Sequence, residues 1–192
     1  MKSYLRPIAA ALALSAAGAT SAATVNFNLA NGPGIDDRQS SFNFSSSGLN
    51  LTISASNLVA YRYDGIGVSS TNIEAGEFNS YAGHNGVESL TFTFDQSIQL
   101  NSISFYLFDN NIDQVLMTYG SNSLTINKNS DAVFSTPLTL NSFTLTAQGL
   151  GTSTRISGLS VDTSAVPVPA AAWLMGSGLL GLAGMARRRR AS

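Results

Sequence analysis

Apolar and polar side chains alternate along much of the chain between residues 24 and 163. Successive side chains of a β-strand point to opposite faces, so this period of two predicts strands with one buried and one solvated face. No segment of this region sustains the period of a helix. The segments that alternate in this way are residues 25–29, 49–53, 90–94, 98–108, 115–119, 124–126, 138–145 and 156–161.

Short clusters of Gly, Asn, Asp and Ser separate these segments and are typical of turns. Many short strands at this spacing predict an all-β fold, namely an antiparallel β-sandwich, with the jelly roll as one such arrangement. Residues 35–47 and 65–85 are rich in small and polar side chains, and we expect them to form long loops. The triplet Leu-Asn-Ser at 100–102 recurs at 140–142, which predicts two similar hairpins.

The N-terminal segment has the composition of a signal peptide, which directs export and is then removed. Two basic residues precede an apolar run over residues 8–17, and small residues follow that run. We expect a signal peptidase to cut after Ala22 or Ala23. The alternative is a retained membrane helix, but the run is much shorter than the roughly 20 residues that span a bilayer. Residues 1–23 are therefore predicted to form a signal peptide.

A second apolar segment, residues 169–186, contains no charged side chain. As a helix it would be about 27 Å long, enough to cross a thin bilayer. Trp173 would then lie near the outer interface of the membrane. Four basic residues follow the segment at once, namely Arg187, Arg188, Arg189 and Arg190. Because such a cluster stays in the cytoplasm, everything before the helix is predicted to face the outer side of the inner membrane.

A proline motif marks the start of this apolar segment. Its residues are Val166, Pro167, Val168, Pro169 and Ala170. Together with the apolar segment and the arginines, the motif resembles the PEP-CTERM sorting signal in its VPxPA variant, which exosortases process. The sorting tail identified by this resemblance occupies residues 164–192. The resemblance implies a Gram-negative bacterium that makes exopolysaccharide, cleavage near the prolines by an exosortase-like enzyme, and release or attachment at the cell surface.

The charge of the region between the two terminal segments differs from that of the whole chain. Residues 24–163 contain all 11 acidic side chains but only 4 of the basic ones, which gives this predicted ectodomain a net charge of −7. Such an acidic region, without a basic stripe, is a poor partner for nucleic acid, whose binding depends on phosphate neutralisation. The chain has no cysteine, so disulfides, thiol catalysis and thiolate metal sites are all excluded.

Calcium is the one cofactor that the sequence suggests. Asp109, Asn111 and Asp113 place oxygen-bearing side chains at alternate positions, as calcium-binding loops do. The match to such a loop ends there, because Gln114 stands where a glycine is needed and Gly120 where a bidentate glutamate is needed. An ordinary turn between strands is the alternative, since Asp and Asn favour turns.

Two tyrosines are the candidates for sugar binding. Tyr61 and Tyr63 are two positions apart, so on a strand they would share one face, on which a sugar ring could stack. Packing against other side chains is the alternative, and it is the commoner role of aromatic residues on strands.

Evidence for catalysis is weak in the sequence. His84 is the only histidine and lies in a loop-like segment, so any Ser-His-Asp triad would depend on it. Acidic residues such as Glu74, Glu77 and Glu88 could pair in space for glycoside hydrolysis, but no pair is indicated. We therefore expect a non-enzymatic, exported surface or extracellular-matrix protein, associated with exopolysaccharide and sorted by an exosortase-like system. A carbohydrate-binding module and a secreted glycan hydrolase remain the alternatives.

Overall fold

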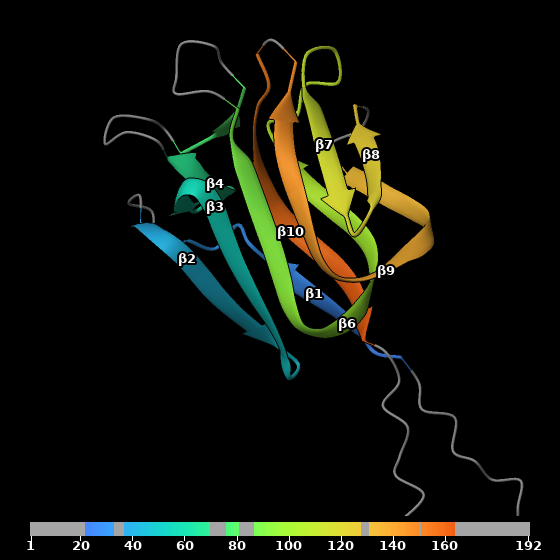
Figure 1. Cartoon of the computed structure of the whole chain (residues 1–192). Helices are drawn as coiled ribbons and strands as arrows, with labels where there is room; N and C mark the ends of the chain where they lie inside the picture. The colour runs from blue at the N-terminus through green and yellow to red at the C-terminus, as the bar shows by residue number, and fades with distance from the viewer. Residues whose placement is uncertain are drawn as a thin grey trace, which may run out of the picture. The chain divides into compact units, whose positions relative to one another are not determined.

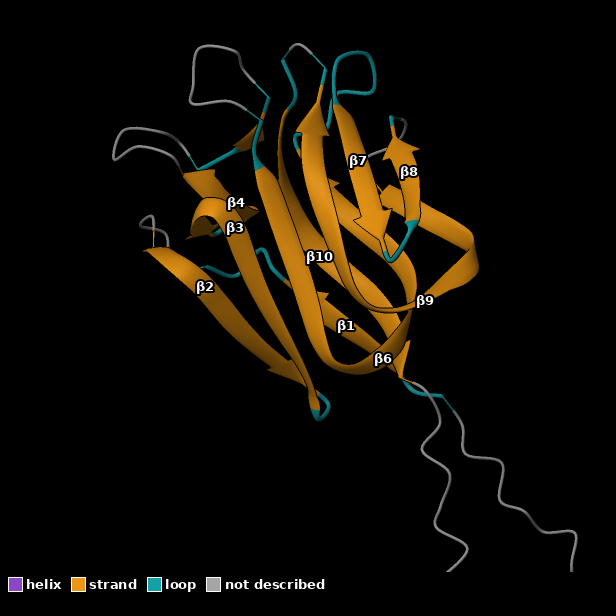
Figure 2. Cartoon of the chain, in the orientation of Figure 1, coloured by secondary structure: helices purple, strands orange, loops and turns teal. Residues whose placement is uncertain are grey.

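Extended strands make up most of the chain that the computed structural model describes, which comprises residues 22–32, 37–69, 76–80, 87–127, 131–149 and 151–163. These residues form ten β-strands and no helix, so the predicted all-β class is confirmed for this part of the chain (Figure 2). The strands are β1 (Thr24–Asn28), β2 (Asp37–Ser46), β3 (Leu49–Arg62), β4 (Gly65–Ser69), β5 (Phe78–Asn79), β6 (Ser89–Tyr106), β7 (Gln114–Tyr119), β8 (Asn122–Ile126), β9 (Asp131–Gln148) and β10 (Ser153–Thr163).

All pairings among these strands are antiparallel, as the alternating sequence predicts. The strand order is β1-β10-β4-β3-β6-β9-β7-β8, with β2 added to β3 and β5 added to β10. A further pairing joins β10 to β6. The path from β3 through β6, β10 and β4 therefore returns to β3, so the sheet curves back on itself.

Two long strands, β6 and β9, bend along their length, and the two halves of each strand have different neighbours (Figure 1). The first half of β6 pairs with β3, and its second half pairs with β10. Between Thr93 and Ile98 the register against β9 shifts, because four residues of β6 lie opposite a single residue of β9. Such a bulge bends a strand and increases its twist. The predicted strands 90–94 and 98–108 are thus one continuous strand with a bend, rather than two strands joined by a turn.

The core is one cluster of buried hydrophobic side chains from every strand except β2, which adds the partly buried Phe42 and Phe44. At its centre the ring of Phe92 stacks on that of Phe143, with centroids 4.7 Å apart and planes only 6° from parallel. Both side chains are almost completely buried. The alternating positions of residues 25–29, 49–53 and 90–94 all contribute buried side chains, which confirms their predicted inward face.

The two stretches predicted as long loops contain strands instead. Residues 37–46 form β2, which pairs with β3 along its length, and residues 65–69 form β4. Position 67 requires a glycine because the backbone of another segment lies close to it, and not because the chain must be flexible there. A Cβ atom at this position would lie 2.0 Å from the carbonyl oxygen of Gly76. Glycine in a strand commonly marks such a close backbone approach, so the small residues of this stretch resemble a loop in the sequence although they form a strand.

The first and last strands of the described region lie side by side. Thr24 of β1 is the register partner of Asp162 of β10, and its hydroxyl donates a hydrogen bond of 2.5 Å to that carboxylate. The N–H of Thr163 donates to the carbonyl oxygen of Ala23 at 3.0 Å. In Figure 1 both ends leave the domain at its lower edge, whereas the β6–β7 and β9–β10 connections lie at the opposite edge.

Candidate functional site

The candidate calcium loop, between β6 and β7, is a turn closed by its own hydrogen bonds. The carboxylate of Asp113 is buried and accepts the backbone N–H of Asp109 at 2.6 Å and that of Ser153 at 2.9 Å, one on each oxygen. The carboxylate of Asp109 accepts the backbone N–H of Asn111 at 2.9 Å. The carbonyl oxygen of Asp109 accepts the N–H groups of Ile112 and Asp113. The loop is therefore fastened both internally and to the start of β10.

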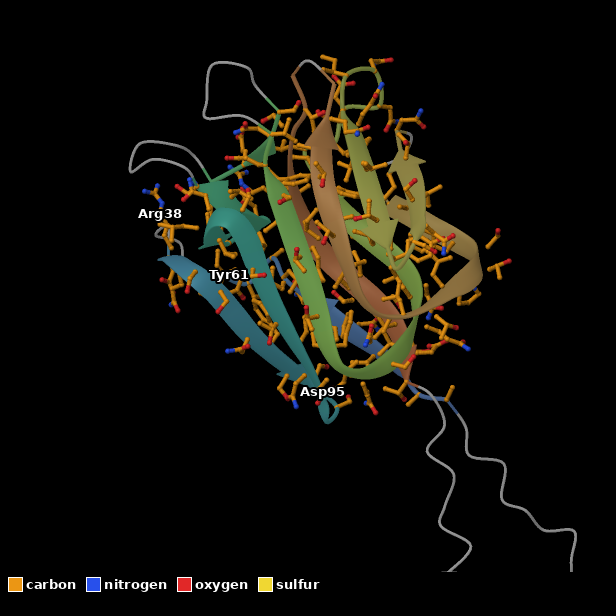
Figure 3. The ribbon with its side chains drawn as sticks, in the orientation of Figure 1. Arg38, Tyr61 and Asp95 are labelled. Carbon is orange, nitrogen blue, oxygen red and sulfur yellow. The ribbon has the colours of Figure 1, made fainter. Side chains whose placement is uncertain are left out.

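These contacts bear on the calcium hypothesis. Backbone N–H groups occupy both oxygens of Asp113, whereas a cation needs several oxygens directed at one point. Asp95, a further acidic residue that could assist a calcium site, instead accepts the backbone N–H and the side-chain amide of Asn50 (Figure 3). Among the residues that the structure describes, no group of three or more His, Cys, Asp or Glu side chains could hold a metal. Calcium binding by Asp109, Asn111 and Asp113 thus stays a prediction.

A substitution of Asp113 tests the structural role of its carboxylate. Asp113→Asn keeps the shape but turns one acceptor into an amide that faces a backbone N–H, so we expect a loss of about 1–3 kcal/mol in the free energy of unfolding. Urea unfolding measures this loss. The exposed Asp109 provides the control, and Asp109→Asn is expected to have a smaller effect. If calcium raises the unfolding midpoint of the wild type and not of Asp113→Asn, the loop is a calcium site after all.

The two candidate sugar-binding tyrosines lie in different environments. Tyr61 is in β3 and packs edge-on against Phe42 and Phe44 of β2, with centroid distances of 5.4 and 5.3 Å (Figure 3). Burial raises the pKa of the Tyr61 phenol above its usual value. Tyr63 lies in the turn after β3, which ends at Arg62, and is 58% exposed. The two rings therefore do not form a pair on one strand face, and sugar binding by them stays a prediction.

An ionic cluster with a buried centre, which no sequence pattern indicates, joins three segments of the domain. We call Arg155, Asp64, Glu77 and Arg62 the Arg155 cluster. The guanidinium of Arg155 contacts the carboxylate of Asp64 at 2.8 Å and that of Glu77 at 3.3 Å. Arg62 is further from Asp64, with its Nε atom 3.8 Å from the carboxylate. The cluster ties the β3–β4 turn and the residue before β5 to β10.

Backbone geometry brings the members of the Arg155 cluster together. Asp64 precedes Gly65, which has a φ of 145°, and a Cβ atom there would lie 2.9 Å from the carbonyl oxygen of Ile156. The turn can therefore press against β10 only with a glycine at this position. Asp64 and Arg155 are 91 residues apart in sequence, so no local pattern could indicate their contact. The only available signal was the scarcity of basic residues in the domain, of which Arg155 is one.

A second buried polar group surrounds Thr152. The hydroxyl of Ser80 donates to the carbonyl oxygen of Gly149 at 2.8 Å, and the N–H of Thr152 donates back to Ser80 at 3.3 Å. The N–H of Gln114 donates to the Thr152 hydroxyl at 3.0 Å. These bonds fasten the β9–β10 connection to neighbouring segments. They satisfy buried polar atoms and so explain the burial of hydroxyl groups at this end of the domain.

The residues considered for catalysis are divided between described and undescribed segments. His84 and Glu74 lie outside the described residues. Glu77 is bound to Arg155 and also accepts the hydroxyl of Ser153, while the buried Glu88 accepts the N–H of Asn79 at 2.8 Å. Both described glutamates therefore have structural partners, and the hydrolase alternative stays a hypothesis.

Most of the features predicted for the two ends of the chain lie outside the described residues. This applies to the signal peptide up to residue 21, to the motif Val166–Ala170, to Trp173 and to Arg187–Arg190. Ala22 and Ala23 are described, and β1 begins immediately after them. Within the described ranges no helix is sufficiently long and apolar to cross a membrane.

Comparison of the chain with models of known protein families gives no match, and comparison with curated proteins gives none either.

Proposed function

We propose that this chain is an exported, non-enzymatic surface or extracellular-matrix protein, sorted by an exosortase-like enzyme. The observation that supports this most directly is the pairing of β1 with β10, which places Ala23 next to Thr163. The signal peptide and the sorting tail thus join the domain at one edge. The β6–β7 and β9–β10 connections lie at the other edge, where a tethered domain would present them to its surroundings (Figure 1).

In this proposal the curved sheet is a β-sandwich of the jelly-roll kind. The bends of β6 and β9 support it, because a strand that changes sheets turns the corner through a bulge or bend. The single core supports it as well, since side chains from opposite ends of the strand order, β1 and β8, belong to one cluster. Residues 24–163 form this ectodomain, and the alternation of inward and outward side chains gives it a solvated exterior.

In this proposal the C-terminal tail determines where the protein is sorted. Residues 169–186 cross the inner membrane as a transient anchor, with Trp173 at the outer interface and Arg187–Arg190 in the cytoplasm. The prolines of the motif prevent a regular helix and keep the chain extended, which suits cleavage by a processing enzyme. The partners are therefore a signal peptidase, an exosortase-like enzyme and the membrane, followed by the exopolysaccharide outside. The acidic ectodomain is not a partner for nucleic acid.

Cell fractionation tests the sorting step. In cells with the exosortase we expect a shortened protein at the surface or in the medium. In cells without it we expect the uncut chain in the membrane fraction, heavier by the mass of the tail. The double substitution Pro167→Ala and Pro169→Ala should reproduce the loss of the enzyme, whereas Ser164→Ala, just outside the motif, should be processed normally. A protein whose size and location are the same in both strains would refute the proposal.

A further inference from the structure

One outward face of the sheet is lined with hydroxyl groups. It is formed by β2, β3, the first half of β6, the second half of β9, β7 and β8, and its side chains alternate with those of the core. A row of register partners crosses all six strands, and every member of this row has a hydroxyl. Its residues are Ser41, Ser54, Thr91, Thr144, Thr118 and Ser123.

Two further rows flank the first. On one side lie Asn43, Thr52, Thr93 and Ser142, and on the other lie Ser89, Thr146, Leu116 and Thr125. We call the residues of these three rows the hydroxyl face. Adjacent strands are about 4.8 Å apart and alternate residues of one strand about 6.7 Å apart, so the face presents polar groups on a regular two-dimensional grid.

The hydroxyl face has no charged side chain, and charged residues are also sparse in the region around it. Residues 24–163 contain 11 acidic and 4 basic residues, and none of them belongs to the three rows. The neighbouring Asp95 is bound to Asn50. Charged residues normally make up about a quarter to a third of a protein surface, so this face differs from an ordinary solvated surface in presenting neutral polar groups.

Cross-strand hydrogen bonds hold several of these side chains in place. The hydroxyls of Thr91 and Thr144 are 3.0 Å apart, and those of Thr93 and Ser142 are 3.4 Å apart. Thr52 donates to the side-chain oxygen of Asn43 at 2.7 Å. Threonine is also restricted in its side-chain rotation because it is branched at Cβ. The grid is thus partly ordered before any partner arrives, which lowers the entropic cost of binding.

We propose that the hydroxyl face binds a neutral polysaccharide. A partner that matches it must be uncharged, must offer many hydroxyl donors and acceptors, and must repeat regularly. An acidic polymer would be repelled by the net charge of −7 in residues 24–163. An apolar partner would contact a single apolar side chain in the three rows, that of Leu116. Single hydrogen bonds of this kind are weak because water competes for them, so affinity comes from many bonds in parallel along an extended chain.

This inference deepens the proposed function and rests on it, because the domain meets polysaccharide only when it has been exported. It also assigns sugar binding to a different surface from the one predicted at Tyr61 and Tyr63. The two surfaces can therefore be separated by substitution.

Retention of the full chain, purified in detergent, on insoluble or immobilised glycans tests the inference. The neutral probes are amorphous cellulose, xylan and dextran, and alginate is the acidic one. Thr93→Lys puts a charge into the hydroxyl face at an exposed position and should weaken retention on the neutral glycan roughly tenfold or more, because the ammonium must be desolvated. Thr139→Lys is the matched control, since Thr139 is equally an exposed strand threonine but pairs with Gln99 outside this face. It should bind as the wild type does, as should Tyr63→Ala.

Several results would overturn the inference: no retention of the wild type on any neutral glycan, an equal effect of the two lysine substitutions, or a loss with Tyr63→Ala alone. A change of oligomeric state in Thr93→Lys with unaltered retention would show that the face contacts a second copy of the chain instead. Thermal unfolding of each variant verifies that it is folded. A chain that binds glycan but is not exported contradicts the proposed function only, and an exported chain that does not bind contradicts this inference only.

Discussion

Replacing Arg155 by methionine is expected to lower the free energy of unfolding by about 3–5 kcal/mol, the cost of removing one partner from a buried ion pair. The side chain of Arg155 is 5% exposed and that of Asp64 is 6% exposed, so neither is screened by water. Without the guanidinium, the carboxylate of Asp64 keeps the more distant guanidinium of Arg62, whose Nε atom is 3.8 Å away. Methionine fills much of the volume of the arginine, so the loss measures the missing charge rather than a cavity.

Urea unfolding gives the size of this effect, and a graded control separates it from a general loss of charge. Arg62→Met removes the more distant and more exposed guanidinium, whose side chain is 23% exposed, and should cost less. A second expectation follows from pairing. In the double variant Arg155→Met with Asp64→Asn much of the loss should be recovered, because the unpaired buried charge is gone as well. If both arginine substitutions cost the same, or if Arg155→Met costs less than about 1 kcal/mol, the ion pair behaves as an exposed one.

The alternation of the sequence predicted the all-β class because burial on one face imposes a period of two wherever a strand borders the core. The pattern was less informative where strands lie at an edge. In β2 only Phe42 and Phe44 are apolar and both are partly buried, so the segment resembles a loop. Its backbone nevertheless pairs with β3 on both sides of an irregularity between Gln39 and Ser41. Pairing of an edge strand depends on the backbone of its neighbour, which leaves little trace in its own side chains.

Strand ends were also difficult to predict. The polar residues at 95–97 resemble a turn, yet β6 continues through them in a bend because β9 follows the same curve beside it. The recurring Leu-Asn-Ser triplets belong to β6 and β9 themselves, which are long strands that pair with each other, rather than to two hairpins. A bend that two strands share is a tertiary feature, and a single sequence does not distinguish it from a turn.

The contacts within the candidate sites were equally difficult to predict from the sequence, because they join residues that are far apart along the chain. The oxygens of the Asp109–Asp113 loop were visible in the sequence, but their main partner outside the loop is the N–H of Ser153, which is 40 residues further along the chain. The Arg155 cluster and the hydroxyl face likewise depend on strand order and register. Sequence alone indicates which residues are polar. Which of them meet is determined by the topology of the sheet.

Phe92→Ala is expected to cost about 3–5 kcal/mol in the free energy of unfolding, since it removes a large buried ring and leaves a cavity that the surroundings fill only in part. Phe92 is 0% exposed and lies near the start of the long strand β6. Its ring is stacked on Phe143 of β9 with a centroid distance of 4.7 Å. The substitution therefore also removes an aromatic contact between the two strands that bend together, and the loss should lie toward the upper part of the range.

Val133→Ala provides the control, because Val133 also lies in β9 but is 75% exposed, and its loss should stay within about 0.5 kcal/mol. Thermal or urea unfolding of both variants measures the difference. Comparison with Phe143→Ala and the double variant then separates the two contributions. Because each single substitution already removes the stacked pair, the double variant should cost less than the sum of the two. Additive losses would mean that the two rings stabilise the domain independently, and would contradict a stabilising contact between them.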